Sequence, residues 1–435
     1  MTHLNWPTYD GYKDSGVEWI GDVPAHWDVE PGRRCVVENK EKNTGMKEGT
    51  VLSLSYGRVI VKGEDDLTGL VPESFETYQV VRPGDIIIRG TDLQNDKTSL
   101  RTGLARDKGI ITSAYINLRP KREIDPAFLH YLLHSYDVKK VFYALGSGLR
   151  QNLSYDDFKY LRLPIPSTEE QHAITAFLDE KCAKVDEAVR IKEEQIALLR
   201  ERRQILIQQA VTRGLNPDVP MKDSGIEWMG QIPAHWNVRR VKHVGLISPS
   251  RTLDRVIPND DVVVFLPMEA VLPDGTVVQD DRRKSKEIYS GFTYFRKGDV
   301  VVAKITPCFE NGKGAWLCDL ETDYGFGTTE LHVIRPVAVN GAFLHRVLNS
   351  EAFLSIGERF MVGSAGQKRV PTAFLADFPI PLPPPSEQLE VVAYIGEEAR
   401  KIDRGIAIKE SQIAALKEYK TTLINAAVTG KIKVA

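Results

Sequence analysis

The chain has 435 residues, more than one ordinary domain contains, so two or three domains are expected. Hydrophobic residues make up 42%, and no run of eighteen apolar residues and no signal peptide is present, which argues against a membrane-spanning or exported protein. The formal net charge of -2 argues against a strong non-specific nucleic-acid binder, but it leaves room for local basic faces. The cysteines form no CxxC pair, so we expect free thiols and a cytoplasmic location; they are Cys35, Cys182, Cys308 and Cys318.

A fifteen-residue element near the start of the chain occurs twice. KDSGVEWIGDVPAHW at 13–27 returns as KDSGIEWMGQIPAHW at 222–236, with eleven identical positions, so the repeating unit has about 210 residues. The element contains four tryptophans, Trp19, Trp27, Trp228 and Trp236. We interpret them as a structural clasp that packs helix ends onto a domain, with base stacking as the alternative.

Each element is followed by a segment that we expect to contain strands and then one amphipathic helix. In the first half the strands are VLSLSYGRVIV, DIIIRG and SAYINLRP, and the helix covers 125–145 and ends at Gly146. In the second half they are DVVVFLPM, GDVVVAKI and TELHVIRP, and the helix covers 341–361. Two anchors recur: RPGD at 82–85 matches RKGD at 296–299, and Phe-Leu-His at 128–130 matches 343–345. The sequences between these anchors differ, so the duplicated scaffold carries divergent loops.

Each segment ends in a proline-bounded exit, LPIPST or FPIPLPPPS, from which a long helix starts. The helices are expected at 169–212, where Ser167 and Glu170 fit a capping box, and at 387–429; Gly214 and Gly430 are expected to end them. A narrow heptad-like apolar seam on each predicts pairing between them over roughly 65 Å. The seam residues are Val185, Val189, Ile196, Leu199, Leu206 and Ala210, and Ile402, Ile406, Ile413, Leu416, Leu423 and Ala427.

The connectivity makes this helix pair antiparallel. The predicted fold is therefore α+β: two similar domains of mixed or antiparallel strands plus helix, joined by a two-helix coiled-coil spacer with pseudo two-fold symmetry. The expected boundaries are a leader at 1–11, the first domain at 12–165, the first spacer helix at 166–214, the second domain at 215–381 and the second spacer helix at 382–435.

The sequence offers little catalytic chemistry. Asn216-Pro217-Asp218 lacks the aromatic residue of an amino-methyltransferase motif, and the glycines at 146–148 do not follow a strand, as a nucleotide-binding turn requires. His130 and His134 have metal-pair spacing, but the second half has Asn349 in place of the second histidine, so a structural pair is favoured. We therefore expect no catalytic, cofactor-binding or metal-binding residues in this chain.

Polar side chains that can read base edges gather where the two halves diverge, although an ordinary solvated loop is the alternative for each one. The candidate DNA-binding residues of the first half are Tyr56, Arg58, Arg89, Thr91, Gln94, Asn95, Lys97, Arg101, Ser147, Arg150, Gln151 and Asn152. Those of the second half are Lys304, Thr306, Asn311, Lys313, Ser364, Gln367, Lys368 and Arg369.

The duplicated KDSG(V/I)EW(I/M)G element with its PAHW end, the RPGD-type turn, the LPIP exit and the paired helices ending in AVT resemble the specificity subunits of Type I restriction-modification systems. The resemblance covers nearly the whole chain. It implies two target-recognition domains that each read half of a split, asymmetric sequence in double-stranded DNA, and a helical spacer that sets the gap and docks two methyltransferase subunits. It also implies that the partners use S-adenosylmethionine, ATP and magnesium, the last two in motor-nuclease subunits, and that this chain uses no cofactor and contacts no membrane.

Two other hypotheses remain open on the residues alone. One is a coiled-coil scaffold whose end domains bind proteins, and the other is a stand-alone DNA-modifying enzyme. Binding to a random duplex library, with and without methyltransferase subunits, separates the three.

Overall fold

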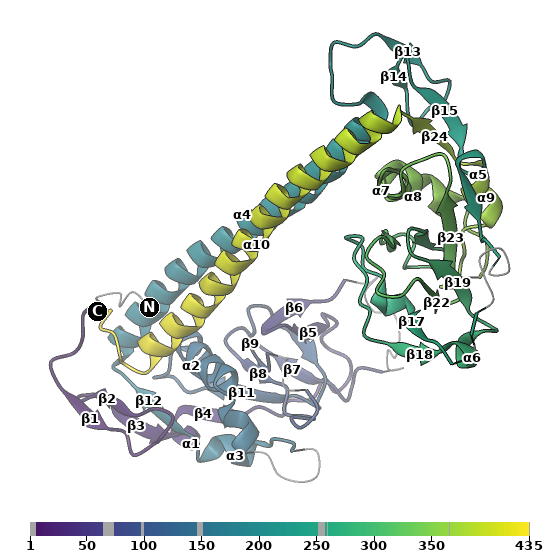
Figure 1. Cartoon of the computed structure of the whole chain (residues 1–435). Helices are drawn as coiled ribbons and strands as arrows, with labels where there is room; N and C mark the ends of the chain where they lie inside the picture. The colour runs from purple at the N-terminus through teal and green to yellow at the C-terminus, as the bar shows by residue number, and fades with distance from the viewer. Residues whose placement is uncertain are drawn as a thin grey trace. The chain divides into compact units, whose positions relative to one another are not determined.

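The structure, a computed structural model, describes residues 6–63, 74–96, 100–145, 151–250, 257–258, 260–364 and 366–434. It divides the chain into two compact units, and each is described by itself. Unit 1 comprises Met1–Lys192 and Glu410–Ala435, and unit 2 comprises Glu193–Lys409. Two long helices, α4 (Thr168–Arg213) and α10 (Pro385–Val428), each contribute one part to each unit (Figure 1). The α+β class and the pair of long helices are thus confirmed.

Unit 1 is built on a four-stranded sheet of order β4-β11-β8-β9, with β4 (Val36–Glu38), β8 (Ile86–Ile88), β9 (Thr102–Leu104) and β11 (Ile116–Pro120). The other strands form antiparallel pairs: β1 (Tyr12–Asp14) with β2 (Asp22–Pro24), β3 (Asp28–Pro31) with β12 (Arg162–Ile165), β5 (Leu52–Ser55) with β6 (Arg58–Val61), and β7 (Gln79–Val81) with β10 (Gly109–Ile111). The shorter helices are α1 (Gly32–Cys35), α2 (Pro126–Val138), the 3-10 helix η2 (Val141–Ala144) and α3 (Tyr155–Lys159).

Unit 2 has a sheet of the same order, β16-β23-β20-β21, with β16 (Gly245–Ile247), β20 (Val300–Ala303), β21 (Gly314–Trp316) and β23 (Leu331–Pro336). Its second sheet, β18-β17-β22-β19, contains β17 (Val262–Leu266), β18 (Arg282–Lys284), β19 (Thr293–Arg296) and β22 (Tyr324–Gly327). Two further pairs are β13 (Met221–Asp223) with β14 (Gln231–Pro233) and β15 (Asn237–Arg240) with β24 (Pro379–Leu382). The helices are α5 (Val241–Val244), η4 (Met268–Ala270), α6 (Ser285–Ile288), α7 (Gly341–Leu348), α8 (Glu351–Arg359) and α9 (Thr372–Asp377).

The repeated RPGD-type turn fixes the centre of the β4-β11-β8-β9 sheet in unit 1 and of the β16-β23-β20-β21 sheet in unit 2. In unit 1 the Asp85 carboxylate accepts the Arg82 backbone N–H across the turn and two hydrogen bonds from the Arg119 guanidinium, at 2.7 and 2.8 Å. In unit 2 the Asp299 carboxylate does the same with Arg296 and Arg335. Because each aspartate is at most 1% exposed, an unpaired charge there would be costly, so turn and strand are held together.

The spacer helices are antiparallel within each unit, as expected. In unit 1 the Lys420 ammonium binds Asp186, and the Lys192 ammonium donates to Gln412 at 2.7 Å. In unit 2 Lys409 donates to Gln195 at 2.6 Å, and Arg203 pairs with Asp403 at 3.0 Å. All predicted seam residues are buried or partly buried. The helix α10 continues through Gly405, which leaves room for the Leu199 side chain.

The first turn of each spacer helix is joined to the repeated PAHW element. In unit 1 the indole of Trp27 donates to Glu170 at 3.4 Å, and His26 contacts the same carboxylate. In unit 2 the indole of Trp236 donates to Glu387 at 2.9 Å, and His235 contacts that carboxylate. Trp27 and Trp236 have no exposed surface, which confirms their predicted structural role. Of the other two, Trp228 stacks on Phe378 and Trp19 is 38% exposed.

Several expected elements are wrong in detail. The helix expected at 125–145 ends at Val138, because Lys140 takes a left-handed conformation with φ of 63° before η2 begins. The helix expected at 341–361 is split into α7 and α8, and the Ser350 hydroxyl caps α8 by accepting the Phe353 N–H. The run VLSLSYGRVIV is a hairpin, with its turn at Tyr56 and Gly57.

The expected capping box is half formed. The Ser167 hydroxyl accepts the Glu170 N–H at 3.3 Å, but the Glu170 carboxylate turns to His26 and Trp27.

We predict that Gly430→Ala destabilises unit 1 more than Gly16→Ala does. Both glycines have left-handed φ values, 71° and 70°, so the conformational cost of about 1–2 kcal/mol is shared. A methyl group at Gly430 would overlap the Pro24 ring and lie 3.3 Å from Trp27, whereas none of the described residues lies within 4 Å of the position at Gly16. The overlap should lower the free energy of unfolding of Gly430→Ala by a further 1–3 kcal/mol or so, about the cost of overpacking a core, as measured by urea unfolding. Equal losses for the two variants would contradict the tight packing at Gly430.

Candidate nucleic-acid interface

Two predicted clusters that lie far apart in the sequence are joined in each unit by the same backbone hydrogen bond. In unit 1 the Leu153 N–H donates to the Gly90 carbonyl at 2.7 Å. In unit 2 the Val370 N–H donates to the Lys304 carbonyl at 2.8 Å. Gly90 lies two residues after β8 and Lys304 one residue after the matching strand β20. The two units therefore present one composite loop surface at equivalent places of the fold. This surface is the candidate nucleic-acid interface.

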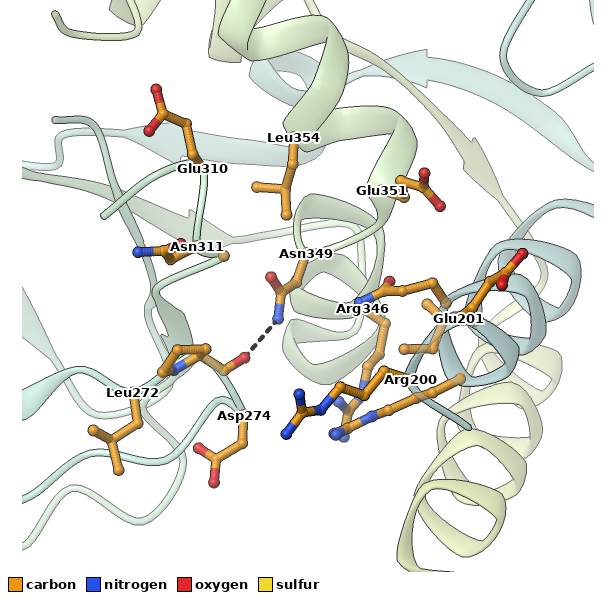
Figure 2. Close-up of a pocket in the computed structure, with 15 residues that line it drawn as sticks. Arg200, Glu201, Leu272, Asp274, Glu310, Asn311, Arg346, Asn349, Glu351 and Leu354 are labelled. Carbon is orange, nitrogen blue, oxygen red and sulfur yellow. Dashed lines mark hydrogen bonds between the residues drawn. The ribbon is translucent and has the colours of Figure 1, made fainter. Parts of the chain in front are cut away.

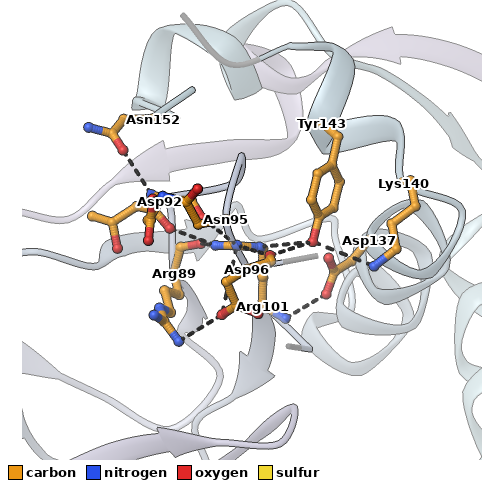
Figure 3. A network of polar contacts seen from close by, with 10 residues as sticks. Arg89, Asp92, Asn95, Asp96, Arg101, Asp137, Lys140, Tyr143 and Asn152 are labelled. Atoms are coloured by element: carbon orange, nitrogen blue, oxygen red, sulfur yellow. Dashed lines mark hydrogen bonds and ion pairs between the residues drawn. The ribbon is translucent and has the colours of Figure 1, made fainter. Parts of the chain in front are cut away.

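In unit 1 the surface consists of the loop at 89–96 and the segment at 151–153 (Figure 3). The Asn152 side-chain oxygen accepts the Asp92 N–H at 2.9 Å, and the Asn95 amide donates to the Asp92 carboxylate at 2.8 Å. Arg89 forms an ion pair with Asp96 at 3.1 Å and is 38% exposed. Leu93 is fully buried and fixes the middle of the loop to the core. Gln94 and Asn95 are therefore presented to solvent on an anchored backbone.

In unit 2 the surface consists of the loop at 304–313 and the residues at 361–364 and 366–370. The backbone N–H of Thr306 donates to the Lys368 carbonyl at 3.0 Å, and isolated bridges join Arg369 to Ile305 and to Val362. The Arg369 guanidinium makes two hydrogen bonds, of 2.9 and 2.8 Å, to Glu330. These contacts bring the two predicted clusters of the second half together as one surface.

The predicted binding residues differ in how far they are available. Those with exposed side chains are Tyr56, Arg58, Gln94, Asn95, Asn152, Asn311, Ser364, Gln367 and Lys368. Those that are partly buried are Arg89, Thr91, Gln151, Lys304, Thr306 and Lys313. Arg101 is fully buried, and Arg369 is exposed but engaged with Glu330. Lys97, Ser147 and Arg150 lie outside the described residues.

Tyr56 and Arg58 do not join the composite surface of unit 1. They occupy the tip of the β5–β6 hairpin, where Tyr56 is 89% exposed and Arg58 lies 4.0 Å from Asp186 of α4. The hairpin tip, α2 and the unit 1 parts of the spacer helices enclose a cavity of about 620 Å³. These two residues are thus placed to contact a ligand separately from the loop at 89–96.

His130 and His134 line this cavity with their ring centroids 6.0 Å apart. Burial, followed by the proximity of His134, lowers the pKa of His130 to about 4, and burial lowers the pKa of His134 to about 4 as well. The described residues contain no group of three histidine, cysteine or acidic side chains arranged to hold a metal ion. Both imidazoles are therefore neutral at pH 7.

Unit 2 has a second cavity, of about 700 Å³, between α4, α7 and the loops at 272–274 and 310–312 (Figure 2). Arg200 and Arg346 project into the same space, close to Asp274. The Asn349 amide donates to the Pro273 carbonyl at 3.2 Å and closes one wall. Burial, and next the nearby Arg203, lower the pKa of Arg346 from its usual value. Four carboxylates also line this cavity, so its net charge does not select anions.

Two basic features of unit 2 were missed in the sequence. Arg346 directly follows the repeated Phe-Leu-His anchor, and Tyr131 takes its place in unit 1, so comparing the two copies position by position would have found it. The run RRKSK at 282–286 is visible in the sequence as four basic residues in five. In the structure it forms β18 and the start of α6, and the Arg283 guanidinium lies 3.7 Å from the centre of the Phe265 ring.

Residues 76–199 match the family model described as "Type I restriction modification DNA specificity domain". The chain is 39% identical over 166 residues to the Type I restriction enzyme EcoEI specificity subunit of Escherichia coli; this covers 37% of the chain but only 27% of that relative. It is 24% identical over 344 residues to the Type I restriction enzyme MjaVIII specificity subunit of Methanocaldococcus jannaschii, covering 75% of each.

A solved structure supports the fold. A chain from work entitled "Structural basis underlying complex assembly and conformational transition of the type I R-M system" is similar with a TM-score of 0.67 and 18% identity, and the match covers 93% of this chain and 98% of that one. Among the described residues, no helix is both long and apolar enough to cross a lipid bilayer.

These features define a protein with two copies of one α+β unit, each with a composite polar loop surface, that share a pair of long helices. In sequence the chain is similar to the specificity subunits of Type I restriction-modification systems.

We predict that His345→Gln removes part of the acid sensitivity of unit 2. His345 is 5% exposed and contacts the Gly314 carbonyl at 3.2 Å, and burial, then the neighbouring Arg346, lower its pKa to about 4. Since the unfolded chain takes up the proton near pH 6.5, stability falls between pH 6.5 and 4. Between pH 6.5 and 4 the free energy of unfolding of the variant should fall by up to about 3 kcal/mol less than that of the wild type. Urea unfolding at several pH values measures this difference.

The control is His243→Gln, which replaces an exposed histidine of the same unit. A His345→Gln variant whose unfolding free energy follows the wild-type pH profile would contradict the assignment.

Proposed function

We propose that this chain is the DNA-recognition subunit of a Type I restriction-modification complex. Each unit reads one half of a bipartite, asymmetric target in double-stranded DNA. The spacer helices set the gap between the halves and dock two methyltransferase subunits. The chain itself is non-catalytic. S-adenosylmethionine, ATP and magnesium act in the methyltransferase and motor-nuclease partners, and the complex works in the cytoplasm.

The observation that carries this proposal is the duplicated composite surface. Both units join two divergent polar segments by an equivalent hydrogen bond, Leu153 to Gly90 and Val370 to Lys304, on sheets of the same order. A duplicated catalytic site would be expected to keep the same reactive side chains in both copies, but here the scaffold is kept and the exposed side chains differ. That pattern supports two recognition sites for two different sequences.

The exposed side chains have the chemistry that base recognition needs. Gln94 and Asn95 in unit 1, and Gln367 in unit 2, carry amides that can both donate to and accept from one base edge. Lys368 adds a donor that suits guanine or a phosphate. Because the backbone beneath these groups is already hydrogen-bonded, little conformational freedom is lost on binding.

The spacer helices carry apolar side chains outside their mutual seam. In unit 2, Leu198 and Ile205 are 62% and 47% exposed and stand seven residues apart on α4, and Ile408 of α10 is 56% exposed. Residues seven apart lie on one face of a helix, which is how a helical protein partner is bound. This supports docking of the methyltransferase subunits on the spacer.

These apolar residues are also compatible with a coiled-coil scaffold that binds only proteins. A random library of DNA duplexes separates the two functions. The recognition proposal expects the chain with its methyltransferase subunits to enrich one split sequence and to methylate it. Enrichment of no sequence, together with stable protein complexes, would favour the scaffold.

We predict that recognition is modular. Exchanging residues 30–165 for those of a relative should change only one half of the methylated target, because both cuts fall in the paired strands β3 and β12, where Leu163 faces Glu30. Methylation mapping of the hybrid complex gives the result. The matched control exchanges 239–380, between the equivalent strands β15 and β24, and should change only the other half. A hybrid with changed bases in both halves would refute modular reading.

We predict that the gap in the target follows the length of the helices. Inserting four residues before Gln195 and four before Gln412 lengthens the spacer by roughly 6 Å, so the gap should grow by about one or two base pairs. The half-target bases should stay the same, with some loss of activity because the heptad phase shifts and one half-site rotates around the duplex. Sequencing of methylated sites measures the gap.

The control for this insertion places four residues after Gly291, an exposed position outside both the spacer and the repeated element. It should leave the gap unchanged. An unchanged gap and full activity in the helix variant would show that the spacing is set elsewhere.

A further inference from the structure

Arg101 is an arginine without exposed surface, located between the loop at 89–96 and β9. Its own backbone is fixed on both sides. The Arg101 carbonyl accepts the Arg89 N–H at 2.9 Å, and the Arg101 N–H donates to the Asp137 carboxylate at 2.6 Å. A buried guanidinium is costly unless every N–H group is satisfied. The partners of this guanidinium therefore indicate what Arg101 does.

All five N–H groups of the guanidinium point to oxygen atoms in unit 1 (Figure 3). One NH2 group donates to the carbonyls of Arg89 and Thr91, at 3.1 and 2.8 Å. The other donates to the carbonyls of Asp92 and Asp96. The fifth N–H donates to the Tyr143 hydroxyl at 3.3 Å, and that hydroxyl in turn donates to the Asp96 carbonyl at 3.0 Å. Four loop carbonyls thus converge on one cation.

We propose that Arg101 is a positioning residue for DNA recognition: it sets the conformation of the loop at 89–96 from behind and does not contact a base. This inference rests on the proposed function, in which Gln94 and Asn95 read the first half-target from that loop. It replaces the sequence-based assignment of Arg101 as a direct DNA contact. We call the Arg101 guanidinium with its four bound loop carbonyls the clamp. Because every residue type has a backbone carbonyl, the clamp holds the loop whatever side chains the loop carries.

The equivalent residue in unit 2 has a related task. Lys313 precedes β21 as Arg101 precedes β9, and the Lys313 carbonyl accepts the Ala303 N–H as the Arg101 carbonyl accepts that of Arg89. Its ammonium donates to the Met268 carbonyl at 2.9 Å and so ties β21 to η4. In both units the cation that follows the recognition loop binds backbone carbonyls inside the protein. The first unit needs arginine because one ammonium cannot reach four carbonyls in a fixed plane.

The surroundings of Asp137 fit this role. One oxygen of its carboxylate is buried without a hydrogen-bond partner among the described residues, and burial raises its pKa to about 6 despite the hydrogen bond from the Arg101 N–H. The Tyr143 ring lies 5.5 Å from the centre of the guanidinium. The clamp is thus embedded in a low-dielectric environment, where its hydrogen bonds are strong.

The test is Arg101→Lys, which keeps the charge but has only three donors. Two measurements are made on the full complex with its methyltransferase subunits. The first is hydrogen exchange at the amides of Arg89, Asp92 and Asp96, which should become at least about tenfold faster, while the loop at 304–313 of the same chain stays at the wild-type rate. The second is the methylation rate on targets with one mismatched base. In the wild type a mismatch should cost roughly 5- to 150-fold in either half.

With Arg101→Lys the mismatch penalty should fall severalfold in the first half-target and stay unchanged in the second. The second half thereby reports that the chain is folded and assembled. The matched control is Arg122→Lys, at an exposed arginine of unit 1, which should leave both penalties and the exchange rates as in the wild type.

Unchanged exchange at the three amides would overturn the clamp, and so would equal loss of discrimination in both halves. Absence of sequence-specific methylation by the wild-type complex would instead refute the proposed function. The exchange measurement alone would then decide whether Arg101 holds the loop.

Discussion

The structure depends on two neighbouring side chains in the first turn of each spacer helix. Glu170 and Glu387 bind the buried clasp tryptophans, and the glutamines that follow them join the helix to the α+β domain. Gln171 accepts the Asp125 N–H at 2.8 Å and donates to the Pro166 carbonyl, and Gln388 accepts the Asn340 N–H at 2.7 Å and donates to the Pro383 carbonyl. Both glutamines are at most 2% exposed. Breaking either contact would therefore leave buried polar groups without partners, at a cost of about 1–3 kcal/mol for each group. The direction in which each helix leaves its domain is therefore set by a short, rigid contact.

This joint explains why identity between the two halves is concentrated in the repeated element. Asp14 and Asp223 each accept the N–H of a glycine two residues on, and both glycines have left-handed φ values that other residues tolerate poorly. The tryptophans at the end of the element fill the space beneath Gly430 and Gly214, where the opposite spacer helix ends. These positions thus meet a backbone or packing requirement of their own unit, and the exposed side chains of the loops meet fewer such requirements.

The sequence predicted the parts of the fold that repeat and failed where a local contact overrides a pattern. The long helices start and end within two residues of expectation, because proline and glycine mark their ends physically. The domain helices were too long, since periodicity continues through Lys140 and Asn349 although the backbone does not. In the candidate site, residue type identified the segments that come together, but it did not show which group each basic side chain binds. Arg101 and Lys313 could bind bases or carbonyls, and only burial separates these roles.

The composite surfaces are held by their backbone, whereas their exposed side chains differ between the two units. The contacts that hold the composite surfaces, from Leu153 to Gly90 and from Val370 to Lys304, join backbone to backbone. Gly90 is restricted, because a methyl group there would lie 2.8 Å from the Leu153 carbonyl oxygen. Gln94 and Asn95 are exposed, and the Asn95 amide is hydrogen-bonded to Asp92. Substitutions of exposed loop residues usually change stability by no more than about 0.5 kcal/mol. Under the proposed function, binding specificity can therefore change at these positions with little effect on folding, which is governed by the buried aspartates, glutamines and tryptophans.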